Sequence, residues 1–129
     1  EKQLANFKKE NTKNIKQQLL NSVIENNGVN LILKEVNMEI DDMKNISFQL
    51  RKEENLAMVL ASRIGEKAIL SVMLTDDLIA KGNNAQQIIS EIAKEINGGG
   101  GGQPFFATAG GSNPDGINNA LNRVKQMII

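Results

Sequence analysis

The side chains that carry most enzymatic chemistry are absent from this sequence, which has no histidine and no cysteine. The chain therefore has no thiol nucleophile and no imidazole base, and a zinc site would need carboxylate ligands alone, which is rare. Adjacent acidic pairs remain, but neighbouring residues on a helix point about 100° apart and are poorly set to share a site. We predict neither a catalytic centre nor a metal site from these pairs, Asp41-Asp42, Glu53-Glu54 and Asp76-Asp77.

The segment 97–111, NGGGGGQPFFATAGG, is the most unusual feature of the sequence. Five consecutive glycines carry a large conformational-entropy cost on ordering. One interpretation is a flexible linker, and the other is a backbone that closely approaches an anion or a base edge. Only about 18 residues follow it, too few for a second domain, which favours a loop folded into one domain. No Gly-Lys-Ser/Thr follows the glycines and no strand is expected before them, which excludes the common nucleotide-binding loops.

The elements that must position this segment follow from hydrophobic periodicity. Residues 1–27 are predicted to form a helical stalk that ends at Gly28, a residue suited to the left-handed cap position. Strands and amphipathic helices follow, which predicts a mixed α/β (or α+β) layer domain over residues 28–129 with a Gly-rich loop. Their predicted order is a strand at 29–36, a helix at 39–53, a hairpin of strands at 56–64 and 68–75, a polar connection at 76–83, a helix at 84–96, a short strand at 105–109 and a helix opened by Asn113-Pro114.

Composition limits the partners of the chain. Lys plus Arg and Asp plus Glu each number 15, so the chain is not a strongly basic nucleic-acid binder, although a local basic patch stays open. Aromatic residues make up 3%, so the core must be aliphatic. No apolar run is long enough to span a membrane. The first residues, Glu1-Lys2-Gln3, show no signal pattern, and we expect a fragment of a longer cytoplasmic protein.

The glycine segment resembles the C-terminal motif of alanyl-tRNA synthetases. That motif reads as a glycine run, a basic residue, Pro, two variable residues, Ala, one variable residue and Ala-Gly-Gly. This chain matches it with Gly98–Gly102, Pro104, Ala107 and Ala109-Gly110-Gly111. It departs from the motif where Gln103 replaces the basic residue and Phe105-Phe106 replace an acidic–Met type of pair.

The resemblance implies a function without catalysis in this fragment. In such synthetases alanine is ligated to tRNA with ATP, Mg and Zn in upstream domains, and the tail domain contacts the outer corner of the tRNA and links aminoacylation with editing. The implied partner is tRNA(Ala), with no cofactor in the fragment and no membrane. Homodimerisation of the same enzyme is one alternative. The other is the associated substrate-binding domain of a DHH-type phosphodiesterase, which often carries a His after the glycines that this chain lacks.

The candidate RNA contacts are backbone groups of the glycine segment and nearby cations. Exposed Phe105 or Phe106 would stack on a base, whereas alternate residues of a short strand would enter the core. We expect Gly100→Val to weaken RNA binding without unfolding the domain. The full predicted set is Gly98, Gly99, Gly100, Gly101, Gly102, Gln103, Gly110 and Gly111, with Arg63, Lys67 and Lys94 as phosphate contacts.

Overall fold

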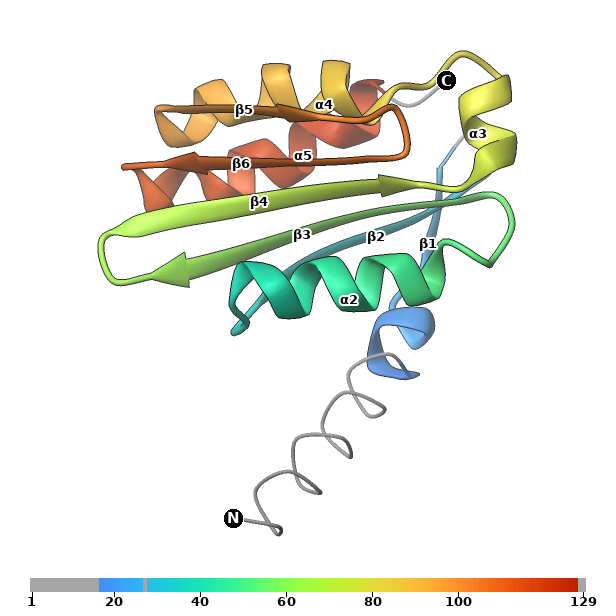
Figure 1. Ribbon diagram of the computed structural model, residues 1–129, viewed down its shortest axis with the longest axis horizontal. Coiled ribbons are helices and arrows are strands. Elements are labelled where there is room, and N and C mark those ends of the chain that lie inside the picture. The colour runs from blue at the N-terminus through green and yellow to red at the C-terminus, as the bar shows by residue number, and fades with distance from the viewer. Residues whose placement is uncertain (1–16, 27, 128–129) are drawn as a thin grey trace, which may run out of the picture.

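A six-stranded mixed sheet in the order β1-β2-β3-β4-β6-β5 organises the chain (Figure 1). The computed structural model describes residues 17–26 and 28–127. The strands are Ile24–Asn26 (β1), Val29–Val36 (β2), Leu56–Ile64 (β3), Lys67–Leu74 (β4), Gly98–Gly102 (β5) and Phe106–Gly111 (β6). The helices are Ile40–Leu50 (α2), Asp76–Ala80 (α3), Ala85–Ile92 (α4) and Ile117–Met127 (α5), with the short 3-10 helices Ala93–Ile96 (η1) and Pro114–Gly116 (η2). The predicted mixed α+β class is confirmed.

The strand connections follow from their directions. β2 and β3 are parallel, and α2 supplies the crossover that parallel neighbours need. The other neighbouring strands pair antiparallel. β3 and β4 form the predicted hairpin, which turns at Gly65 with a φ of 62°, a conformation that glycine adopts without strain.

Each face of the sheet carries its own aliphatic core. One face packs against α4, η1 and α5, which cover the sheet from behind in Figure 1. The other face packs against α2 and a helical turn at residues 17–21. The seam predicted for the helix at 39–53 is confirmed, because Met43, Ile46 and Leu50 are buried on the sheet. Phe106 is the aromatic residue among the buried hydrophobic side chains of the second core.

The first predicted helix is wrong at its C-terminal end. Residues 17–21 are helical, but Ile24–Asn26 form the edge strand β1. β1 pairs antiparallel with the start of β2, and the chain reverses through Gly28, whose φ is 83°. Pairing with a neighbouring strand is a tertiary interaction that helical spacing in the sequence does not report. The predicted stalk at residues 1–16 lies outside the described part of the chain.

Two predicted irregular segments are ordered elements. The polar connection at 76–83 contains α3, a helix of five residues that is too short to show a periodic pattern. The predicted Gly-rich loop is wrong, because Gly98–Gly102 form the edge strand β5, paired along its whole length with β6. Sequence disfavours a glycine strand because glycine has no side chain to pack and loses much entropy.

Asp77 joins the beginnings of β3 and α3. Its carboxylate accepts hydrogen bonds from the Thr75 hydroxyl at 2.6 Å and from the backbone N–H of Asn55 at 2.9 Å. Asn55 has a φ of 54° and also donates its side-chain amide to the Gly28 carbonyl at 2.7 Å. The Thr75 hydroxyl and the Asn55 N–H hold the pKa of Asp77 below its ordinary value, because both favour the charged carboxylate.

We expect Asp77→Asn to lower the free energy of unfolding by about 0.5 kcal/mol near neutral pH, a small effect because the carboxylate is exposed and screened. A carboxyl group whose pKa is lowered by folding stabilises the fold above its unfolded pKa and loses that contribution as the pH falls through the folded value. The gap between wild type and variant should therefore close in acid. Urea unfolding at about pH 7 and about pH 2 measures it, and a gap that persists in acid would contradict this role of the charge.

Candidate nucleic-acid interface

Among the described residues, one part of a sheet face is not covered by any helix. In Figure 1, α2 lies in front of β2 and β3, whereas α4 and α5 lie behind β6 and β5 and no helix lies in front of these two strands. Phe106 packs on the α2 side, so alternation along β6 places Thr108 and Gly110 on that same face. In the register, Gly101 lies beside Thr108 and Gly99 beside Gly110. We call these four residues, Gly99, Gly101, Thr108 and Gly110, the glycine face.

The glycines of β5 fall into two alternating sets. A Cβ atom added at Gly98, Gly100 or Gly102 would overlap the backbone of β6, on the carbonyl oxygens of Gly110, Thr108 and Phe106 respectively. A Cβ atom at Gly99 or Gly101 meets nothing within 4 Å. The first set is therefore required for the fold, whereas the second leaves bare peptide groups on the surface.

Contacts at both ends fix β5. Asn97 has a left-handed φ of 53° and turns the chain from η1 into β5. At the other end the backbone N–H of Gln103 donates to the Phe106 carbonyl at 2.8 Å and closes the β5–β6 hairpin. Pro104 accepts from the N–H of Ala85 at 2.9 Å, which ties this turn to the start of α4. The glycine face is therefore held by the hairpin and by the helices behind it.

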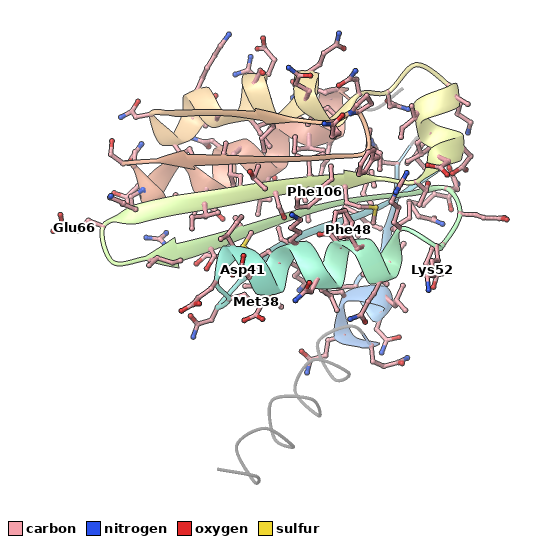
Figure 2. The ribbon with its side chains drawn as sticks, in the orientation of Figure 1. Met38, Asp41, Phe48, Lys52, Glu66 and Phe106 are labelled. Carbon is pink, nitrogen blue, oxygen red and sulfur yellow. The ribbon has the colours of Figure 1, made fainter. Side chains whose placement is uncertain are left out.

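An aromatic cluster borders the glycine face. Phe48 of α2 has its ring centroid 5.2 Å from that of Phe106 and 6.4 Å from that of Phe105. Figure 2 shows Phe48 and Phe106 close together on the side of the sheet that faces the viewer. Phe48 is 37% exposed and Phe106 8% exposed. Phe106 thus enters the core, and Phe105 is half-buried beside it.

Two cations lie on this aromatic cluster. The Lys44 Nζ is 5.8 Å from the centroid of the Phe48 ring, and the Arg51 guanidinium carbon is 4.0 Å from that of Phe105. Arg51 also pairs with Asp76 at 3.0 Å, which neutralises its charge. Within residues 17–26 and 28–127, no carboxylate oxygen lies within 4.0 Å of the Lys44 ammonium, so Lys44 forms no ion pair there.

The predicted phosphate contacts occupy different places. Arg63 and Lys67 flank the β3–β4 turn. Arg63 pairs in the sheet with Ala68, Ala68 pairs with Gly111 of β6, and Gly111 pairs with Gly98 of β5. Arg63 is paired with Glu35 at 3.3 Å and Asp115 at 3.6 Å. Lys67 is exposed and has no ion pair with any described carboxylate.

Lys94 lies away from the glycine face. It belongs to η1, which packs on the opposite side of the sheet, and its ammonium pairs with Glu91 at 3.3 Å. Gly111 is next to Ile96, whose carbonyl oxygen a Cβ atom at position 111 would overlap, so this glycine serves packing. The structure thus places Gly99, Gly101, Gly110 and Lys67 on the open side of the sheet, whereas Gly98, Gly100, Gly102, Gly111, Arg63 and Lys94 lie on the opposite side.

Sequence reasoning missed Phe48 and Lys44. Both lie on α2 outside the seam of Met43, Ile46 and Leu50. The position of Phe48 off the apolar seam of its helix could have indicated a role outside the core, because such a ring must either stay exposed or pack on a distant element.

Neither a cluster of metal-binding side chains nor a membrane-spanning helix is found among the described residues. Residues 17–26 and 28–127 contain no group of three or more His, Cys, Asp or Glu side chains placed to hold a metal ion. In the same residues, no helix is long and apolar enough to cross a membrane.

Comparison with known proteins gives this mixed α+β domain its family. A model of the DHHA1 domain matches residues 17–129, and the chain belongs to that family. The crystal structure of the C-Ala domain from Aquifex aeolicus alanyl-tRNA synthetase superimposes with a TM-score of 0.77 and 26% identity, covering 82% of this chain and 96% of that one. A DHH domain described as a member of the s1p family of ribosomal proteins has a TM-score of 0.56 at 12% identity, a likeness of fold alone.

Curated relatives extend the similarity over nearly the whole chain. Alanine–tRNA ligase of Bacteroides fragilis is 46% identical over 128 residues, which cover 98% of this chain. The enzyme of Christiangramia forsetii is 42% identical over 129 residues. The chain spans about 15% of the length of these relatives. The predicted resemblance to the C-terminal tail domain of alanyl-tRNA synthetases is confirmed.

The alternation in β5 changes the expected effect of glycine substitutions. Gly100→Ala should lower the free energy of unfolding by about 2 kcal/mol, because its Cβ atom would overlap the backbone of β6. Gly101→Ala should leave the free energy of unfolding unchanged or raise it by about 0.5 kcal/mol. Its Cβ atom meets no protein atom within 4 Å, and alanine reduces the conformational entropy of the unfolded chain. Urea unfolding of the matched pair tests this, and equal stability of the two variants would contradict the alternation. A Val at position 100 is therefore expected to disturb the fold, contrary to the sequence-based expectation.

Proposed function

We propose that this chain is the tRNA-binding, non-catalytic C-terminal appendage of an alanine–tRNA ligase. The glycine face is the observation that supports the proposal most directly. Bare peptide groups at Gly99 and Gly101 allow a ligand backbone to come closer than any side chain would permit. RNA helices are recognised largely by shape and by contacts to phosphate and sugar, for which a flat polar backbone surface is suited.

The proposed mechanism is positioning of the tRNA. The outer corner of the L-shaped molecule rests on the glycine face, and Lys67 at the β3–β4 turn contacts a phosphate. Holding tRNA(Ala) at this corner links aminoacylation with editing, two reactions carried out by other parts of a cytoplasmic enzyme. As the resemblance implies, ATP, Mg and Zn act in those other parts of the enzyme.

The alternatives receive no comparable support from the described residues. A homodimerisation module needs a contiguous apolar surface, and within residues 17–26 and 28–127 the exposed large hydrophobic residues are Ile24, Phe48 and Ile64, on three different elements. For the DHH-type phosphodiesterase alternative, the comparison shows a similar fold at 12% identity and nothing more.

A titration with whole tRNA at two salt concentrations tests the proposal. We expect weak binding that falls as salt rises, because phosphate contacts by lysine release counterions. A hairpin RNA without the tRNA corner should compete poorly. Absence of tRNA binding at low salt, or equal competition by the hairpin, would contradict recognition of the corner.

Gly101→Val tests the glycine face itself. The added side chain meets no protein atom within 4 Å at its Cβ, so the fold should persist while the tRNA is held away. We expect the dissociation constant to rise about tenfold, roughly 1.4 kcal/mol. Gln87→Val is the matched control, because Gln87 is exposed on α4 behind the sheet. Wild-type affinity in a folded Gly101→Val variant would count against this face.

A further inference from the structure

We propose that Phe48 and Phe105, together with Lys44, form a stacking subsite for one exposed nucleobase of the RNA. This inference rests on the proposed function and adds Phe48 and Lys44, two residues outside the glycine motif, to its contacts. Its residues come from two segments far apart in the chain, α2 and the turn before β6. The fold brings these segments together.

The aromatic cluster is preorganised for stacking. The Phe48 ring is held at 5.2 Å from the buried Phe106 ring and 6.4 Å from the Phe105 ring, and it remains 37% exposed. A ring fixed on one side and open on the other loses little side-chain entropy when a base stacks on it. Every base has a π-face, so such a contact tolerates any sequence.

Charge favours a nucleotide as the occupant. The Lys44 ammonium lies 5.8 Å from the Phe48 ring and has no carboxylate partner in the described chain, so it is free to contact the phosphate beside the stacked base. Arg51 lies 4.0 Å over Phe105 and is oriented by Asp76. Its guanidinium plane extends the aromatic surface, since arginine planes also stack on bases.

The subsite is continuous with the glycine face. Phe106, against which Phe48 packs, lies two residues before Thr108 on the same side of β6, a separation of about 7 Å along a strand. A single RNA segment on the glycine face therefore reaches the aromatic cluster. An exposed base at the edge of a folded RNA would occupy the cluster while the neighbouring backbone crosses the glycines.

Tryptophan fluorescence gives a direct readout of stacking. The chain has no Trp and no Tyr, so Phe48→Trp introduces a single strong fluorophore at the subsite. Saturating tRNA should quench its emission. Ile24→Trp is the matched control, because Ile24 is 42% exposed on β1, at the opposite edge of the sheet from β5. Its emission should change little with the same tRNA.

Affinity measurements complete the test. Phe48→Leu keeps an apolar side chain but removes the ring, and we expect the dissociation constant for tRNA to rise about tenfold. Phe48→Tyr keeps the ring and should bind like wild type. Lys44→Gln should reduce the slope of log affinity against log salt by about one, the signature of a lost phosphate contact. Thermal unfolding of each variant establishes that it is folded.

The outcomes separate this inference from the proposed function. Quenching at position 48 but not at 24, with weaker binding by Phe48→Leu, supports the subsite. If Gly101→Val weakens binding while Phe48→Leu binds normally and the emission at 48 does not change, the subsite is wrong and the tRNA function stands. If the wild-type chain does not bind tRNA at low salt, both proposals fail.

Discussion

The close approach of β5 to β6 is the constraint on which the open surface depends. A Cβ atom at Gly98, Gly100 or Gly102 would overlap a carbonyl oxygen of β6, so this edge of the sheet can exist only with glycine at alternate positions. The entropic cost of ordering these glycines is offset by pairing along the whole strand and by packing against α4 and η1. Once this backbone is fixed, the remaining glycines, Gly99 and Gly101, present bare peptide groups to solvent.

The two faces of the sheet have different roles, since one packs against the helices α4, η1 and α5 and the other carries the proposed binding surface. The face covered by α4, η1 and α5 buries a long row of aliphatic residues and supplies most of the packing against β5 and β6. Among the described residues, the opposite face is covered by α2 and by the helical turn at residues 17–21, and the aromatic cluster around Phe48 borders its open part. An edge strand with exposed backbone is normally a liability for aggregation. Here the exposed groups are those of glycine, which adds no apolar side chain to the surface.

Local pattern predicted much of the fold. Apolar spacing located α2, α4 and α5, and the paired apolar runs located the β3–β4 hairpin to within a residue or two. It failed where pairing partners decide the conformation. β1 and β5 are edge strands whose hydrogen bonds come from a neighbour in the sheet, and neither Ile24–Asn26 nor five glycines carries a strand signal of its own. α3 has five residues and is too short for periodicity to show.

The sequence by itself determined the family and the chemistry that is absent. A glycine run followed by Pro and Ala-x-Ala-Gly-Gly is a local pattern, and the lack of His and Cys is a matter of composition. Only the tertiary structure decided which glycines are required and which are open, because that depends on the distance to β6. It also decided that Lys94 lies behind the sheet and paired with Glu91, and that Phe48 meets Phe105 and Phe106 beside the glycine face. Contacts between residues more than 50 positions apart arise from the order of strands in the sheet, which the spacing of residues along the chain does not encode.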